Sequence, residues 1–492
     1  MPPVSAEPAT FNLRSPGWRA AYGLVCCAGA WVVTALYRYY YRVGGAQRHH
    51  VETAWMWFLA ITVTFAALRP AATRSPGVGQ SPSKVGQAAL FAGFVGLAFG
   101  VYISTLRLGF LSDDFVLAAR AARNEFLGPA AEFFRPLSLL VYKLGGTRPV
   151  ALHAFNIVLH GVNSALVVPV ALSFGLSPAV AIVAGGLFLT YPGHVEAVAW
   201  SAGVQDLLMT ALTLAAIVMF RTRPVWAAAP LAAALLAKET AVAAPALAWL
   251  SQPRRWRVVV AGAAVVIVYA VLRITFGPVS RGYIVAPTGY LIKELLVRPF
   301  ATLTVPLHSE VVVRWPLIGV VLASSVVVLV IRAAAIWQGD RRTILTLVAA
   351  TLWVLLAAAP VYTLLNVTGT LQGARYLYLP ACGWAVLIAA LLAPDRSRWN
   401  LAISIALCAA GGVGVMINLR PWSAASGWRD EILARVTTAR TAGCVSVWVS
   451  DVPDSIDGAY VFRNGLAEAI DPIRLDPAAP PQCRVSGGIA AR

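Results

Sequence analysis

The chain has 492 residues, of which 59% are hydrophobic and 12% are charged, and its formal net charge is +18. Soluble domains contain roughly 45–50% apolar and about 25% charged residues, so this composition, with a mean hydropathy of +0.72, excludes a soluble protein. The apolar runs reach the roughly 20 residues that cross a bilayer and lack the alternation of a membrane barrel. They predict a polytopic helical membrane protein.

The predicted spans are apolar runs separated by polar connections. One further apolar stretch, 225–250, is interrupted by Lys238 and Glu239, and we interpret it as two half-length helices that form a re-entrant pair. The alternative is one long helix whose lysine extends to the membrane surface. The sequence thus predicts an all-α polytopic fold with about 11–13 transmembrane helices. In chain order the spans lie near 20–38, 52–68, 87–110, 151–173, 178–191, 203–220, 258–275, 315–333, 343–363, 376–393 and 400–418.

Basic residues in short loops predict the orientation, because they are enriched on the cytoplasmic side. Most basic clusters fall on the face of the N-terminus, which we expect to be cytoplasmic in a cell inner or plasma membrane. The first apolar run lacks a small-residue cleavage site and is interpreted as a retained helix. The net charge therefore indicates topology and affinity for membrane lipids, and no nucleic-acid module is visible. The clusters are Arg69, Arg74 and Lys84; Arg221 and Arg223; Arg254, Arg255 and Arg257; Arg332, Arg341 and Arg342; and Arg396 and Arg398. The exception is Arg38, Arg42 and Arg48, which this topology places on the outer side of the membrane.

Three regions follow from this topology. Residues 1–86 hold an N-terminal tail and two additional helices, residues 87–419 form the main transmembrane domain with a long outer loop at 111–150, and residues 420–492 form a small extracytoplasmic domain. Residues 290–300 are predicted to form an interfacial helix.

The C-terminal tail differs in composition from the rest of the chain. Val445–Val449 and Ala459–Phe462 are typical of short strands, so the tail is predicted to be a small α/β unit. Cys444 and Cys483 would form a disulfide in an oxidising exterior, and two free thiols are the alternative. We expect the tail to rest on the outer face, over a pair of acidic residues.

That acidic pair is Asp113-Asp114, which directly follows the apolar run that ends near Phe110. Ionisable groups at a membrane edge are rare and tend to mark a function. The alternative is a helix cap, in which Ser112 or Asp113 precedes a helix over 115–125 and the helix dipole favours the negative charge. Two like charges so close would raise the proton affinity of one of them, which favours a base.

Two basic residues belong with this pair. An unpaired ammonium in the break at Lys238 would be costly unless it meets an anion. Arg375 lies at another outer helix end, beside Tyr376. We therefore predict that Lys238 and Arg375 converge on one outward cavity that faces Asp113.

Several ordered motifs give the chain a resemblance to a known family. It resembles the GT-C superfamily of polytopic glycosyltransferases, which use polyprenyl-phosphate sugars, and in particular the membrane part of transmembrane O-mannosyltransferases that carry tetratricopeptide repeats. Here no helical-repeat period follows Trp422, Val204-Gln205 precede Asp206 where a basic residue is usual, and Ala374 stands where glutamate is usual. The motifs are Ser112-Asp113-Asp114-Phe115, Phe134-Arg135-Pro136-Leu137-Ser138, His153-Ala154-Phe155-Asn156 with His160 and Asn163, Tyr191-Pro192-Gly193-His194-Val195-Glu196-Ala197-Val198-Ala199-Trp200, Lys238-Glu239, and Arg375-Tyr376-Leu377-Tyr378-Leu379-Pro380.

The resemblance implies transfer of a sugar from a polyprenyl-phosphate donor to an extracytoplasmic hydroxyl of a protein, glycan or lipid, with inversion. Mannose is favoured by the family, while other sugars suit the residues equally. Asp113 is the expected base, and Asp114 would orient the acceptor or a cation. The expected contacts to the donor phosphate and substrate are Arg135, His194, Glu196, Lys238, Glu239, Arg375 and Tyr376.

A bound metal ion and two other protein classes are the alternatives to this interpretation. Adjacent carboxylates can bind Mg²⁺ or Mn²⁺, but no second ligand cluster is visible, so we expect no obligatory metal. The alternative function is a lipid or solute transporter or flippase, whose polar residues would form a path near the midplane. A non-catalytic membrane scaffold that presents the tail is a third interpretation.

Overall fold

The computed structural model describes residues 84–126, 134–221, 223–251, 256–276, 299–300, 302–304, 306–309, 341–361, 367–392, 398–444, 447–470 and 483–486. The predicted spans near 20–38, 52–68 and 315–333 lie outside these residues, as does nearly all of the predicted interfacial helix at 290–300.

Long apolar helices form the body of the protein, which confirms a multi-pass membrane fold. Five helices in the described part of the chain are long and apolar enough to cross a membrane, and a sixth candidate span is bent by 48° between α7 (Pro178–Leu189) and the segment Pro192–Ala199. That segment comprises η2 (Pro192–His194) and α8 (Val195–Ala199). The five spans are α3 (Lys84–Tyr102) with η1 (Ile103–Arg107); α6 (Pro149–Ser173); η3 (Ser201–Gly203) with α9 (Val204–Phe220); α16 (Arg341–Ala358) with η6 (Ala359–Val361); and α18 (Arg398–Asn418) with α19 (Arg420–Thr441).

Shorter apolar helices complete the bundle. The stretch predicted to be re-entrant contains α10 (Ala228–Ala237), the 3-10 turn η4 (Glu239–Ala243) and α11 (Ala244–Ser251), so the helix breaks at Lys238 as predicted. Both α10 and α11 pack against α12 (Trp256–Phe276), as two halves of a re-entrant pair would. The last of these helices is α17 (Pro380–Leu392), which starts four residues later than the predicted span at 376–393.

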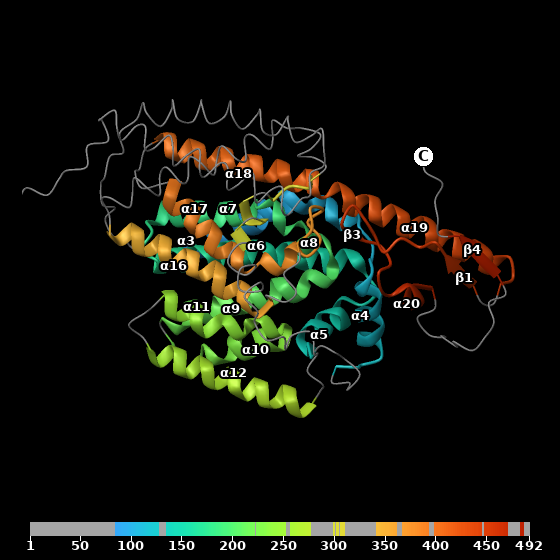
Figure 1. Ribbon diagram of the computed structural model, residues 1–492, viewed down its shortest axis with the longest axis horizontal. Helices are drawn as coiled ribbons and strands as arrows, with labels where there is room; N and C mark the ends of the chain where they lie inside the picture. The colour runs from blue at the N-terminus through green and yellow to red at the C-terminus, as the bar shows by residue number, and fades with distance from the viewer. Residues whose placement is uncertain are drawn as a thin grey trace, which may run out of the picture.

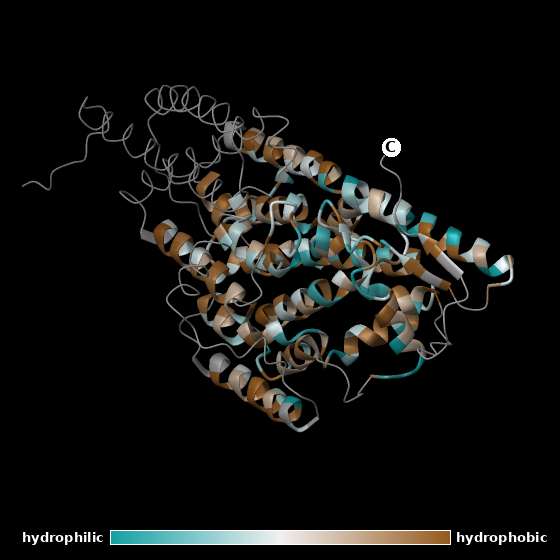
Figure 2. Ribbon diagram, turned by 45° about the vertical axis from the view of Figure 1, so that its right-hand side comes forward, coloured by the Kyte–Doolittle hydropathy of each residue, from teal (hydrophilic) through white to brown (hydrophobic). Residues whose placement is uncertain are grey.

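The helices lie side by side with α6 in the middle and α12 and α18 at opposite edges (Figure 1). Hydrophobic residues dominate the long helices, whereas hydrophilic residues gather at one end of the bundle and along α19 (Figure 2). Large side chains fill the interior between the helices because only close packing joins apolar helices within a membrane. The largest fully buried ones include Trp353, Tyr102, Tyr142, Tyr378 and Phe188.

The hydrophilic end of the bundle, which we call the polar end, is built by short elements. The loop at 111–150, which was predicted to lie on the outer face, contains α4 (Asp113–Ala122) and α5 (Pro136–Gly145), of which only the first was predicted. Between α16 and α17 the chain makes the short 3-10 turn η7 (Ala374–Leu377) at this end.

The C-terminal tail leaves the bundle on a long helix. Only Leu419 separates α18 from α19, so the predicted domain boundary at 420 falls within a nearly continuous helical rod. The strands β1 (Val447–Ser450) and β4 (Cys483–Ser486) pair in parallel, and β2 (Ser455–Ile456) and β3 (Ala459–Tyr460) pair antiparallel. The short helix α20 (Leu466–Ile470) follows. Cys444 is disulfide-bonded, and the strand register places Cys483 opposite Val447.

Candidate active site

The Asp pair begins α4, and its two carboxylates have different surroundings. Asp113 is the first residue of the helix and is partly exposed, whereas Asp114 is fully buried. Ser112 makes no side-chain capping hydrogen bond and has φ 49°, a conformation that non-glycine residues rarely adopt. Ser112 therefore does not cap α4 through its side chain, although both aspartates lie in the first turn, where the helix dipole favours negative charge. The strained residue before Asp113 is typical of a functional site.

Asp114 is a structural residue. Its Oδ2 accepts a hydrogen bond from the Leu111 amide at 2.9 Å, and its Oδ1 accepts from Tyr142 at 2.8 Å and from the Ala202 amide at 2.7 Å. Burial raises the pKa of Asp114 to about 7, although these hydrogen bonds lower it. Its carboxylate holds η3 and α5 to the start of α4 and does not line the cavity beside Asp113, so a role of Asp114 in orienting the acceptor or a cation stays a prediction.

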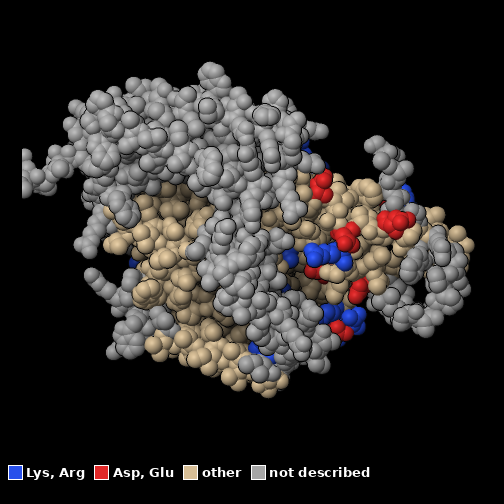
Figure 3. Space-filling view, viewed as in Figure 1, with Lys and Arg blue, Asp and Glu red and all other residues tan. Residues whose placement is uncertain are grey.

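A cavity of about 480 Å³ opens beside Asp113 at the polar end. Lys238 and Arg375 both line it, which confirms the predicted convergence on Asp113. Arg135 and Tyr376, two more predicted residues, also line it. Acidic and basic side chains gather at this end of the molecule, whereas the bundle surface beside it has few (Figure 3). The other charged or polar side chains at the cavity are Arg120, Ser138, Gln205, Asp206, Asn464 and Glu468.

Each of the three predicted cations is held by a carboxylate. Lys238 donates to Asp206 at 2.5 Å, and the side chains are only 3% and 6% exposed. Arg135 forms a two-pronged ion pair with Glu239, in which its Nε donates at 2.9 Å. The cations are thus fixed in place before any ligand binds.

Arg375 is the third of these cations and is surrounded by aromatic rings. Its guanidinium pairs with Glu196, and its backbone amide donates to the same carboxylate at 3.0 Å. The guanidinium lies 4.8 Å from the Trp200 ring centre and 4.9 Å from that of Tyr376. Such stacking favours arginine over lysine at this position.

Glu196, Glu239 and His194 do not line the large cavity. The two glutamates stand behind it as partners of Arg375 and Arg135, so their predicted place at the site is indirect. His194 is 1% exposed and packs among Phe188, Tyr191, Tyr378 and His160, with ring centres 4.4 to 5.3 Å away. The His194 ring thus lies inside the bundle and not at the cavity, and its predicted contact with substrate stays a prediction.

The polar residues of the motif at 153–163 bind buried backbone and side-chain groups and do not line the cavity. Asn156 donates to the Trp200 carbonyl at 2.9 Å, and Asn163 donates to the Leu207 carbonyl at 2.9 Å. His160 contacts the Tyr378 hydroxyl at 2.7 Å. These bonds from α6 fix the turn that carries Trp200 and the start of α9, where Asp206 lies.

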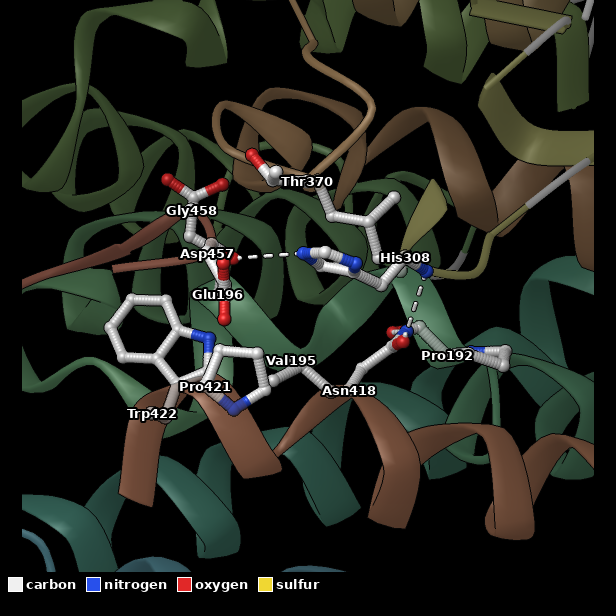
Figure 4. Close-up of a pocket in the computed structure, with 12 residues that line it drawn as sticks. Pro192, Val195, Glu196, His308, Thr370, Asn418, Pro421, Trp422, Asp457 and Gly458 are labelled. Atoms are coloured by element: carbon white, nitrogen blue, oxygen red, sulfur yellow. Dashed lines mark hydrogen bonds between the residues drawn. The ribbon is translucent and has the colours of Figure 1, made fainter. Parts of the chain in front are cut away.

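A second, smaller cavity of about 10 Å³ lies on the other side of Glu196, between the tail and the bundle (Figure 4). His308 and Asn418 line it, with a hydrogen bond of 3.3 Å from the His308 amide to Asn418 Oδ1. This volume is that of about one water molecule.

Sequence reasoning missed Gln205, Asp206 and Asn464 as site residues. Asp206 had a usable signal, since a lysine buried at a helix break requires a nearby carboxylate and Asp206 begins an apolar run. Gln205 accepts a hydrogen bond from Arg135. Asn464 had no signal, because an asparagine in a turn-rich tail is ordinary.

The site has no evident metal centre. No three His, Cys, Asp or Glu side chains come together in the described part of the chain to hold a metal ion. The two carboxylates of the Asp pair do not form a common ligand set, because both Asp114 oxygens already accept hydrogen bonds inside the protein.

Comparison with curated proteins reveals partial similarity to O-mannosyltransferases. Protein O-mannosyl-transferase Tmtc1 of Drosophila melanogaster is 36% identical over 183 residues, which are 31% of this chain and 21% of that protein. Tmtc2 of the same species is 37% identical over 134 residues, and TMTC4 of Mus musculus is 36% identical over 93 residues. These matches cover 23% and 15% of this chain, and 14% and 13% of those proteins.

The matches thus span about a fifth of these relatives or less. No family model and no solved structure matches the chain. The resemblance to O-mannosyltransferases that the motifs indicate is confirmed as a similarity over part of the chain.

Proposed function

We propose that the protein is a membrane glycosyltransferase that moves a sugar, with mannose favoured, from a polyprenyl-phosphate donor to an extracytoplasmic hydroxyl. The observation that carries the proposal is the cavity in which Asp113 meets Arg135, Lys238 and Arg375. Sugar transfer from a phosphate needs a base for the acceptor and cations for the leaving group, and this cavity offers both. The similarity to proteins named O-mannosyl-transferases supports the assignment.

In the proposed step the acceptor oxygen attacks the anomeric carbon of the donor sugar. Asp113 takes the hydroxyl proton while the new carbon–oxygen bond forms and the bond from the anomeric carbon to the phosphate oxygen breaks. The polyprenyl phosphate leaves with the electron pair. A single displacement of this kind inverts the anomeric configuration and requires no covalent enzyme intermediate.

The donor phosphate would lie against Arg135, Lys238 and Arg375, which line the same cavity as Asp113. Arginine suits two-pronged contacts with phosphate, and lysine acts as a compact charge. The lipid part of the donor would remain in the membrane beside the bundle, because the cavity lies at the end of the spans.

The basic ends of the helices support an extracytoplasmic site. Four long helices carry a basic residue at the end that does not lead to the polar end of the bundle. These residues are Lys84 in α3, Arg221 after α9, Arg341 in α16 and Arg398 in α18. Basic residues mark the cytoplasmic ends of spans, so the cavity and the tail are proposed to face the opposite side.

The test uses the purified protein in liposomes with polyprenyl-phosphate sugars that differ in the sugar. Hydroxyl acceptors of three kinds, namely Ser/Thr peptides, glycans and lipids, are added, and released polyprenyl phosphate is measured. We expect release with at least one donor and none with Asp113→Asn. The control is Asp454→Asn, which changes an exposed carboxylate of the tail.

Movement of intact donor across the bilayer without release would indicate the transporter instead. Parallel reactions with EDTA, Mg²⁺ or Mn²⁺ test whether a divalent cation is required. Release that persists in Asp113→Asn would refute the assigned base.

A further inference from the structure

The C-terminal tail returns to the active-site cavity after α19 has left the bundle. The chain turns through β2 and β3, and β3 lies beside the polar end of the bundle (Figure 1). Gly458, with φ +85°, allows a close approach there, since a Cβ atom would lie 2.4 Å from the Thr370 carbonyl. His308 donates to the neighbouring Asp457 carbonyl at 3.2 Å, a contact drawn in Figure 4.

The next residues of the tail bind the loop that carries Asp113. The backbone amide of Ser112 donates to the Val461 carbonyl at 2.8 Å, and the backbone amide of Asn464 donates to the Ser112 hydroxyl at 3.2 Å. The rings of Phe462 and Phe115 stack with centres 5.8 Å apart. These contacts join two segments about 350 positions apart in sequence and support the rare backbone conformation of Ser112.

Asn464 makes direct contact with the proposed base. Its Nδ2 donates to Asp113 Oδ1 at 2.6 Å, whereas the Ser112 hydroxyl reaches the same oxygen only at 3.5 Å. Both of these bonds are to Oδ1. Among the described residues, Oδ2 is therefore left to accept the proton of an acceptor hydroxyl. Asn464, Gly465 and Glu468 line the cavity together, which makes the tail one of its walls.

We infer that the tail segment 457–468 is a built part of the transfer site and that Asn464 is a positioning residue for Asp113. This inference rests on the proposed function. An amide donor on one oxygen fixes the carboxylate plane and leaves the other oxygen free to meet the acceptor, and a precise site requires such support for its reacting groups. The donor phosphate contacts lie on other elements, so Asn464 acts on the acceptor side of the reaction.

The test compares Asn464→Ala with Asn464→Asp, which keeps the shape of asparagine but loses the donor and adds a like charge beside Asp113. In the liposome assay we expect kcat to fall about 10- to 100-fold in Asn464→Ala, the effect of one hydrogen bond to a charged group. KM for the donor should stay within about twofold. Asn464→Asp should be worse than Asn464→Ala, whereas a residue that only fills space would tolerate it.

Gly465→Ala gives a second, independent test, because a Cβ atom there would lie 2.4 Å from the Ser112 carbonyl and would push the segment from Asp113. It should also lower kcat, with thermal unfolding measured in parallel. Asp454→Asn is the tail control.

The outcomes separate the two proposals. If no donor releases polyprenyl phosphate, or if Asp113→Asn is active, the proposed function fails. If Asp113→Asn is inactive but both Asn464 variants keep the wild-type kcat, only the positioning role is overturned. A rise in kcat in Asn464→Ala would also overturn it, because the tail would then be an inhibitory cover.

Discussion

Lys238 forms a buried ion pair with Asp206 and is also proposed to bind the donor phosphate. Single and double substitutions at this pair can separate these two roles. The two side chains are 3% and 6% exposed and 2.5 Å apart, and Lys238 also lies 5.2 Å from the Tyr376 ring centre. Lys238→Met removes one charge and leaves the carboxylate of Asp206 buried without its partner. Breaking such a pair typically destabilises a protein by about 3–5 kcal/mol.

The double variant Lys238→Met/Asp206→Leu removes both charges. It should recover most of the lost stability, since replacing a buried pair by apolar residues of similar volume is often neutral or stabilising. If Lys238 binds the donor phosphate, the double variant should fold and yet transfer no sugar. If Lys238 serves only to hold Asp206, the double variant should regain activity.

Thermal unfolding in detergent measures the first effect, and polyprenyl phosphate release in liposomes measures the second. Arg435→Met is the matched control, because Arg435 pairs with Glu431 on α19 with side chains 35% and 47% exposed. An exposed pair of this kind contributes at most about 0.5 kcal/mol. Wild-type stability in Lys238→Met would refute the buried pair, and full activity in the double variant would refute the phosphate contact.

Three further predictions follow from the same site. Asp113→Asn should abolish transfer with little change in thermal stability, whereas Asp114→Ala should lower stability strongly, because three buried donors lose their acceptor at about 1–3 kcal/mol each. The pKa of Asp114 is raised from 3.8 to about 7, so its stabilising contribution is complete below pH 3.8 and is lost as the pH rises through about 7; the unfolding temperature should fall between about pH 4 and 7 in the wild type, but less in Asp114→Ala. Cys444 should react with a membrane-impermeant thiol reagent in intact cells only after reduction, since it is disulfide-bonded; labelling that needs an opened membrane would place the tail and the cavity on the cytoplasmic side.

The membrane architecture was predictable because it depends on local hydrophobicity. The spans near 151–173 and 203–220 agree with α6 and α9 within about two residues. The break at Lys238 was also predictable, since a charge inside an apolar run has few tolerable structures. By contrast, α5 was not predicted, although Pro136 stands in its first turn, a position that proline favours.

The candidate site was only partly predictable. Lys238 and Arg375 could be expected near Asp113 because each is a charge at a helix end or break with no place in hydrocarbon, whereas Arg135 was expected at the site only from the family resemblance. The separation of Asp113 from Asp114 was not predictable, because it depends on Tyr142 and Ala202, which approach Asp114 only in the folded bundle.

The paired cations also indicate how a charged donor can enter the cavity. Lys238, Arg135 and Arg375 are each paired with a carboxylate, so these three cations do not place uncompensated positive charge at the membrane edge. A phosphate must therefore bind through hydrogen-bond donors that the carboxylates leave over. An ammonium has three donors, and in the described structure Lys238 uses one of them on Asp206. The donor would then be recognised by geometry as well as by charge, since it must meet those remaining N–H groups while its anomeric carbon reaches Asp113.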